Sequence, residues 1–212
     1  LADPDKEVEK DKAEHYRKDI ETRAQRIPLQ HITGEQEFMG LDFKVNEHVL
    51  IPRQDTETLV EEALKKIRPG MQILDMCTGS GCILLSLLLE LPQALGTGVD
   101  VSEGALCVAK ENRKRLGLEQ RAELIQSDLF SADYFRKNSG NDHMEYDMLI
   151  SNPPYIRTED IEGLMEEVRF HDPVLALDGK ENGLYFYEKI TEQAGTYLKP
   201  GGWLMYEIGC DQ

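Results

Sequence analysis

The segment Ile73-Leu74-Asp75-Met76-Cys77-Thr78-Gly79-Ser80-Gly81 joins an apolar run to a turn that contains two glycines. The run predicts a buried strand over 71–76, and the apolar residues after the turn predict a core helix that ends near residue 91. Glycines at a strand-to-helix turn let a ligand approach the backbone, and the N-terminus of the helix favours a negative group. The segment therefore predicts the first strand of an α/β sheet and a ligand-binding turn.

Strands and helices alternate after this turn. The later strands are expected at 96–101, 122–125, 148–151 and 203–208, and the main helices at 104–116 and 184–197. This alternation predicts an α/β fold with a doubly wound, mostly parallel, Rossmann-like sheet.

Three parts are expected along the chain. In residues 1–27, apolar side chains recur at three- and four-residue spacing, which predicts a small helical segment. A lone helix could not bury that face, so it either packs on the main body or is the remnant of a helical substrate-binding domain. Residues 28–51 predict a β-hairpin linker around Gly40. Residues 52–212 form the sheet domain, which opens with a helix from Asp55 that Pro69-Gly70 stops.

The charge limits the possible partners of the chain. Its 212 residues include 24 Lys+Arg and 40 Asp+Glu, a net charge of −16, and residues 27–212 hold 32 of the acids and 17 of the bases. Binders of duplex nucleic acid depend on basic side chains, so no direct nucleic-acid partner is expected. No apolar run is long enough for a membrane span, and the charged N-terminal residues are not those of a signal peptide.

The four cysteines lie at positions 77, 82, 107 and 210, and their spacing is not that of a zinc site. We expect buried, reduced thiols in a cytoplasmic protein and no bound metal. The five histidines are scattered, so no catalytic base is expected among them.

An acid lies at the end of the second predicted strand. Asp100 lies 21 residues after Gly79, where a carboxylate can accept hydrogen bonds from ribose hydroxyls. The turn lacks the third glycine of the dinucleotide fingerprint, which weakens an NAD interpretation. The combination resembles the class I S-adenosylmethionine-dependent methyltransferases. That resemblance implies S-adenosylmethionine as cofactor, S-adenosylhomocysteine as product, and a pocket formed by Cys77, Thr78, Gly79, Ser80, Gly81, Asp100, Asp128, Leu129 and Asn152. Cys77 stands where the family usually has glycine, and Leu129 where an aromatic residue can occur.

The sharpest motif is Asn152-Pro153-Pro154-Tyr155, directly after the predicted strand 148–151. The Asn152 side-chain oxygen and the Pro153 carbonyl can accept the two N–H bonds of a planar amino group, and the prolines hold these acceptors in place. Tyr155 can stack on the planar group. We therefore expect Asn152, Pro153 and Tyr155 to be catalytic and all four residues to bind substrate. The alternative is a proline-rich turn without function.

Upstream segments narrow the substrate. Pro28-Leu29-Gln30-His31-Ile32-Thr33-Gly34 and Val49–Glu57, with the later Ala176-Leu177-Asp178-Gly179, closely resemble the release-factor protein-(glutamine-N5) methyltransferases of the HemK/PrmC family. The resemblance implies methyl transfer to the glutamine of the Gly-Gly-Gln loop in class 1 peptide chain release factors. A monomer is expected by default. Arg53, Asp55, Thr56 and Glu57 would shape the pocket wall. An equally good interpretation of this segment is a helix start capped by Asp55 or Thr56.

Alternatives remain at this stage. The same motif would serve glutamine methylation of a ribosomal protein, or methylation of an adenine or guanine amino group in nucleic acid, although the acidic body disfavours the latter. A catalytically silent S-adenosylmethionine-binding module is a third possibility. Asp172-Pro173 would face the site by resemblance, and a solvated turn is an equally good interpretation.

Overall fold

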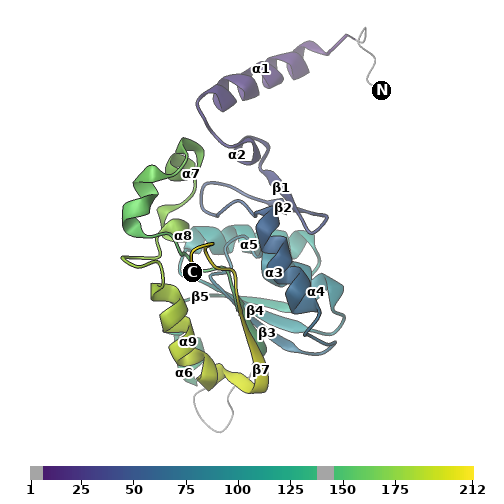
Figure 1. Cartoon of the computed structure of the whole chain (residues 1–212). Coiled ribbons are helices and arrows are strands. Elements are labelled where there is room, and N and C mark those ends of the chain that lie inside the picture. Colours follow the sequence, from purple (N-terminus) through teal and green to yellow (C-terminus); the bar gives the residue numbers. More distant parts are fainter. Residues whose placement is uncertain (1–6, 138–145) are drawn as a thin grey trace.

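The computed structural model describes residues 7–137 and 146–212 (Figure 1). The N-terminal part contains helices α1 (Lys10–Ala24) and α2 (Leu29–Thr33), followed by strands β1 (Glu35–Phe38) and β2 (Leu41–Lys44). The body contains strands β3 (Gln72–Met76), β4 (Leu95–Asp100), β5 (Ala122–Gln126), β6 (Tyr146–Ser151) and β7 (Leu198–Tyr206). Its helices are α3 (Gln54–Leu64), α4 (Cys82–Glu90), α5 (Glu103–Arg115), α6 (Asp133–Lys137), α7 (Glu166–His171), α8 (Val174–Leu177) and α9 (Tyr185–Tyr197), with a 3₁₀ helix η1 (Thr158–Gly163).

The body is built around a five-stranded sheet in the order β5-β4-β3-β6-β7. Every neighbouring pair in this sheet is parallel, which confirms the predicted doubly wound fold. The chain moves outward from β3 to β5 on one side, and then returns to place β6 and β7 on the other. The order therefore reverses between β3 and β6, and ligands of such sheets bind at the carboxyl ends of the strands near this point.

Alternate residues of β3 enter two different cores, because successive side chains of a strand point to opposite faces. Ile73 packs with residues of α3 and α4, and Leu74 packs with Phe135 of α6 and Ile190 of α9. Figure 1 shows α3 and α4 on one side of the sheet and α6 and α9 on the other. Helix α4 is buried along most of its length, as the apolar run predicts.

The hairpin β1–β2 forms around Gly40, as predicted, and it is packed on the body rather than free. Phe38 and Phe43, one from each strand, make an edge-to-face contact and belong to the same core as α3 and α4. The packed hairpin thus sets the position at which the segment 45–53 starts.

Helix α1 forms where the spacing predicts it, but its apolar face is not packed along the body. None of its fifteen residues is buried, and Tyr16 on the predicted face is 66 % exposed. Arg23 ties the end of the helix to the body through an ion pair with Glu167, with 2.7 Å between nitrogen and oxygen. In Figure 1 the helix projects away from the sheet.

Several sequence-based expectations are wrong in detail. Helix α3 begins at Gln54 with Arg53 as its N-cap and no side-chain cap, so neither Asp55 nor Thr56 caps it. Strand β7 begins at Leu198 rather than at 203, because an irregularity in its pairing with β6 accommodates the Pro-Gly-Gly segment. Cys107 and Cys210 are exposed rather than buried, since they lie outside the core-facing positions of their segments.

Among the residues that the structure describes, no helix is both long and apolar enough to cross a membrane.

Truncating the hairpin's core contact tests its role in stability. Phe43→Ala should lower the free energy of unfolding by about 3–5 kcal/mol, because a fully buried ring is replaced by a cavity. Tyr16→Ala, at the exposed face of α1, should change it by less than about 0.5 kcal/mol. Urea unfolding measures both, and equal losses for the two variants would contradict this packing.

Candidate active site

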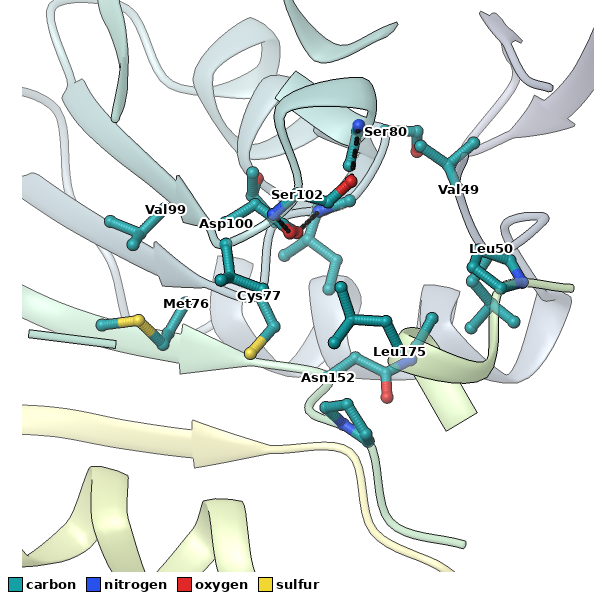
Figure 2. Close-up of a pocket in the computed structure, with 18 of the residues that line it drawn as sticks. Val49, Leu50, Met76, Cys77, Ser80, Val99, Asp100, Ser102, Asn152 and Leu175 are labelled. Atoms are coloured by element: carbon teal, nitrogen blue, oxygen red, sulfur yellow. Dashed lines mark hydrogen bonds between the residues drawn. The ribbon is translucent and has the colours of Figure 1, made fainter. Parts of the chain in front are cut away.

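A cavity opens at the carboxyl ends of the parallel strands, next to the point where the strand order reverses (Figure 2). Its empty volume is about 980 Å³, which includes space open to solvent. The segments that follow β3, β4, β5 and β6 all contribute lining residues, and residues 48–53 close the opposite side. Figure 2 shows Asp100 and Ser102 across this space from Val49 and Leu50, with Asn152 between the two walls.

The turn after β3 has an unusual backbone. Cys77, Gly79 and Gly81 have φ angles of 61°, 56° and 81°, all in the left-handed region. Glycine adopts this region freely, whereas a residue with a side chain is strained there. A Cβ on Gly79 would meet no atom within 4 Å, so Gly79 is needed for its backbone angle and not for lack of room. The turn therefore exposes its backbone to the cavity.

Asp100 fixes this turn from the end of the neighbouring strand. One carboxylate oxygen accepts the N–H of Gly79 and the other accepts the N–H of Ser102, both at 2.9 Å. Burial raises the pKa of Asp100 above its ordinary value, and hydrogen bonds from the backbone oppose that shift. Each oxygen retains a second lone pair, so the carboxylate can still accept hydrogen bonds from a ligand.

Asp75 supports the turn from within β3. It is fully buried, and its carboxylate accepts the hydroxyl of Thr78 at 2.6 Å. Burial raises the pKa of Asp75 to about 7, against the opposing effect of the Thr78 hydrogen bond. The segment that predicts the first strand thus also contains the acid that orients its turn.

Asn152 follows β6 and lines the cavity. Its side-chain nitrogen donates to the hydroxyl of Thr56 at 3.3 Å, and Thr56 is buried in α3. An amide whose nitrogen is engaged in this way has its oxygen free to accept a hydrogen bond. Thr56 therefore sets the orientation that an acceptor role of Asn152 requires.

The wall formed by residues 48–53 is joined to the loop before α8. Arg53 forms an ion pair with Asp172 at 3.4 Å, and Pro173 lines the cavity. Asp172 is 8 % exposed, so the solvated-turn interpretation of this dipeptide is wrong. Burial raises the pKa of Asp172, and the charge of Arg53 opposes this shift.

Tyr155 does not line the cavity. It lies at a second groove, whose lining includes residues 207–212 at the C-terminal side of β7. Its hydroxyl donates to Glu207 at 3.4 Å. The backbone beside it is held by Gly179, whose N–H donates to the Ile156 carbonyl at 2.7 Å and whose Cβ, if present, would lie 2.7 Å from the Tyr155 Cα. A side chain at position 179 would therefore displace Tyr155.

The structure brings most of the predicted site residues into one cavity. The predicted residues that line it are Cys77, Thr78, Gly79, Ser80, Asp100, Asp128, Leu129, Asn152 and Pro154. Gly81, Pro153 and Tyr155 are not among its lining residues; Gly81 is instead the N-cap of α4. Leu129 is held at a φ of 49°, which is strained for a leucine.

Sequence reasoning missed two groups. Ser102, Ala105, Leu175 and Phe186 line the cavity, and no local pattern distinguishes them from ordinary helix residues. Glu207 could have been found, because an acid directly after the last strand occupies the same kind of position as Asp100.

The lining suits a nucleoside ligand that carries an amino acid. Ser80 lines the cavity, and its buried hydroxyl has no geometrically good hydrogen bond among the described residues, so a ligand polar group could supply one. Asp100 offers carboxylate lone pairs, and the apolar side chains of Val99 and Leu129 can contact a base. Within 7–137 and 146–212, no three His, Cys, Asp or Glu side chains are grouped to hold a metal ion.

Comparison with known proteins gives two family matches. The family model described as a methyltransferase domain matches residues 67–210, and the one described as the PrmC N-terminal domain matches residues 1–34. A release factor glutamine methyltransferase of Geobacter sulfurreducens is 47 % identical over 91 % of this chain, which spans 64 % of that protein. One of Caulobacter vibrioides is 42 % identical over 100 % of this chain, which spans 71 % of that protein.

Solved structures agree on the fold. A putative S-adenosylmethionine-dependent methyltransferase from Streptococcus mutans superposes with a TM-score of 0.55 and 16 % identity, covering 81 % of this chain and 40 % of its own. At this identity the likeness concerns the fold alone.

The left-handed angle at Cys77 can be tested by substitution. Cys77→Gly should leave the free energy of unfolding within about 1 kcal/mol of the unaltered protein, because relief of strain offsets lost packing. Cys77→Val should be less stable than the glycine variant by about 2 kcal/mol, since a β-branched residue is a poor fit to positive φ. Urea unfolding gives both values, and equal stability of the two variants would contradict the observed angle.

The buried Asp75 predicts a pH dependence of stability. Between pH 4 and 7 the unfolded chain ionises this group while the folded chain keeps it protonated, so its contribution to stability falls as pH rises. The fall should be on the order of 3 kcal/mol across this range and should end above pH 7. Asp75→Asn, which keeps an acceptor for Thr78, should lack it. Unfolding measured at several pH values gives the difference between the two proteins, and parallel curves would refute the assignment.

Proposed function

Because the chain belongs to the release factor glutamine methyltransferase family, we propose that it transfers a methyl group from S-adenosylmethionine to a release factor glutamine. The single observation that carries this proposal is the pairing of Asn152 with Thr56 at the edge of the cavity. The proposed acceptor is the glutamine of the Gly-Gly-Gln loop in class 1 peptide chain release factors. This reaction takes place where translation does, in the cytoplasm.

The proposed cofactor site uses the turn after β3. S-adenosylmethionine supplies an electrophilic methyl group attached to a positively charged sulfur. We assign the amino-acid part of this cofactor to residues 77–81, with Ser80 and the open backbone of Gly79 as the polar contacts. Asp100 would accept hydrogen bonds from the ribose hydroxyls, and Asp128 and Leu129 would lie beside the adenine base of the cofactor.

The proposed chemistry of Asn152 follows from its orientation. The side-chain amide nitrogen of the substrate glutamine is a weak nucleophile because its lone pair is conjugated with the carbonyl. The two N–H groups of this substrate amide would donate to the Asn152 oxygen and to the Pro153 carbonyl, which aims the substrate nitrogen into the cavity. The same acceptors would stabilise positive charge as it develops on the nitrogen, and the proton then leaves to water. Tyr155 would pack on the planar amide from the second groove.

The charge around Tyr155 supports a protein substrate over a nucleic acid. The second groove is lined by four carboxylates, those of Asp55, Asp160, Glu207 and Asp211. Arg157 is the one basic side chain in the described lining, and it is paired with Asp211 at 2.9 Å. Such a groove repels a phosphate backbone and admits a neutral or basic peptide.

We propose a separate function for each of the three parts of the chain. Residues 52–212 would hold the cofactor and the catalytic residues, and residues 28–51 would link them to the N-terminal segment. Residues 1–27 would belong to a substrate-binding unit, which the exposed face of α1 and the PrmC N-terminal domain match support. We propose a monomer as the simplest arrangement of these three parts.

Two variants test the proposed reaction. Asn152→Ala should lower kcat for methylation of a class 1 release factor at least about 100-fold, because both the positioning and the charge stabilisation are lost. Thr56→Val, which only removes the orienting acceptor, should lower it about 10-fold. Transfer of labelled methyl groups measures both, and calorimetry should show cofactor affinity within about 3-fold of the unaltered protein.

The methyl-accepting release factor provides the matched control. A release factor whose Gly-Gly-Gln glutamine is changed to alanine should take up no label. Full activity of Asn152→Ala would refute the catalytic role, and methylation of an oligonucleotide but not of the release factor would refute the proposed substrate.

A further inference from the structure

Asn112 is a buried polar residue that the proposed chemistry does not use. It lies in the last turn of α5, and its exposed fraction is 0 %. Its side-chain nitrogen donates to two backbone carbonyls, those of Lys44 at 3.0 Å and Ser80 at 2.9 Å. Its oxygen accepts the N–H of Lys44 at 2.7 Å. All three bonds reach backbone atoms of segments that are far from α5 in sequence.

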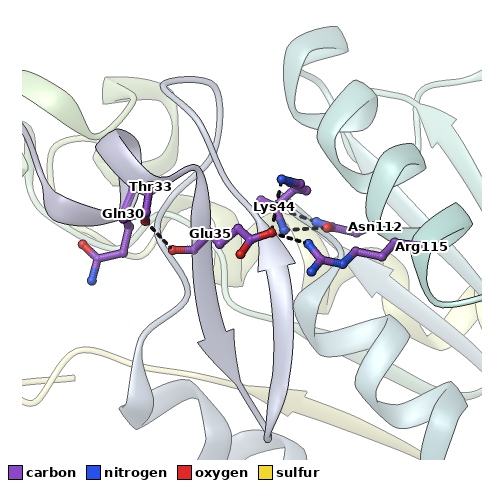
Figure 3. A network of polar contacts seen from close by, with 6 residues as sticks. All are labelled: Gln30, Thr33, Glu35, Lys44, Asn112 and Arg115. Atoms are coloured by element: carbon purple, nitrogen blue, oxygen red, sulfur yellow. Dashed lines mark hydrogen bonds and ion pairs between the residues drawn. The ribbon is translucent and has the colours of Figure 1, made fainter. Parts of the chain in front are cut away.

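The two segments held by Asn112 lead to opposite walls of the cavity. Ser80 belongs to the turn after β3, and Lys44 ends strand β2, directly before the segment that forms the wall of residues 48–53. The Asn112 amide pairs with both backbone groups of Lys44, as a neighbouring strand would. Figure 3 shows Asn112 reaching from α5 to the hairpin.

The packing around α5 leaves little freedom between these walls. A Cβ on Gly104, in the first turn of α5, would lie 2.7 Å from the His48 ring. Ala105 and Val108 form a small core with Val45 and Val49. Helix α5 is therefore a common platform for both walls, and Asn112 is its polar connection to each.

We propose that Asn112 is a positioning residue that holds the turn at Ser80 and the hairpin at Lys44 in fixed register across the cofactor cavity. The inference rests on the proposed binding of S-adenosylmethionine at this turn. Loss of the hydrogen bond from the Asn112 side-chain nitrogen would leave the Ser80 carbonyl without a partner. The turn would then shift, because a buried carbonyl without a partner is unfavourable.

The predicted signature separates positioning from simple stability. Asn112→Asp keeps the shape of the side chain but places an oxygen against the two carbonyls. It should raise the dissociation constant and the KM for S-adenosylmethionine about 10-fold, measured below the melting temperature of the variant. At saturating cofactor, which itself holds the turn, kcat should stay within about 3-fold. A role in stability alone would lower the melting temperature and leave KM unchanged.

Matched controls lie in the same network. Arg115 and Glu35 form an ion pair at 2.7 Å that also joins α5 to the hairpin, but neither contacts Ser80 (Figure 3). Arg115→Gln and Glu35→Gln should leave the KM for the cofactor unchanged, since exposed pairs of this kind contribute little.

A measurement on the unaltered protein keeps the inference testable if Asn112→Asp does not fold. Binding of S-adenosylmethionine should slow hydrogen exchange at the Lys44 N–H several-fold, because that amide shares Asn112 with the turn. The adjacent Val45 N–H donates to the Gly34 carbonyl and should not respond.

The outcomes are distinct. An unchanged KM in a folded Asn112→Asp variant, or equal responses of Lys44 and Val45, would overturn this inference while the proposed function stands. Failure of the unaltered protein to bind S-adenosylmethionine would overturn the proposed function, and the inference with it.

Discussion

The bond from the Gly79 N–H to the Asp100 carboxylate joins the ends of two neighbouring parallel strands. It holds a turn whose backbone is left-handed at three alternate positions, a conformation that the chain does not adopt without support. Asp75 and Thr78 brace the same turn from beneath, and Asn112 braces it from the side. The cavity depends on this turn, because four of its residues, 77–80, line it next to the ends of β4 and β6.

The sheet topology explains why the remaining site residues meet there. Parallel strands present their carboxyl ends at one edge, so the acid that ends β4 and the asparagine that follows β6 lie on either side of β3 without any special loop. The hairpin positions what the sheet cannot supply, namely the wall of residues 48–53 opposite the strand ends. Its placement depends on two buried phenylalanines and on the side-chain amide of α5.

The fold and the main site could be predicted because their signals are local. Alternation of strands and helices, a glycine turn and an acid 21 residues later are all visible in a short window of sequence. The short helices between 158 and 177 could not be predicted, because four to six residues are too few for a period to appear. Packing that no local pattern records determines the exposure of Cys107 and Cys210, and it also determines the N-cap at Arg53.

The pairing of side chains could not be predicted for the same reason. Asn152 and Thr56 are 96 positions apart, and Asn112 and Lys44 are 68 apart. Nothing in either local sequence marks the partner. The assignment of Asn152 as an acceptor came from the chemistry of the motif, and the contact that orients it required the folded chain.

The strand order also divides the site into two parts that differ in the sequence separation of the strands that must pair. Strands β3, β4 and β5 pair in the order in which they are synthesised, so the half of the site formed by residues 77–129 needs only short-range loop closure. The other half requires β6 to return and pair with β3, in a register that sets Leu149 opposite Leu74. Contacts of such high sequence separation fold slowly. The part of the proposed cofactor pocket formed by residues 77–129 is thus topologically independent of the motif at Asn152. Pairing of β3 with β6 brings that motif into the same cavity.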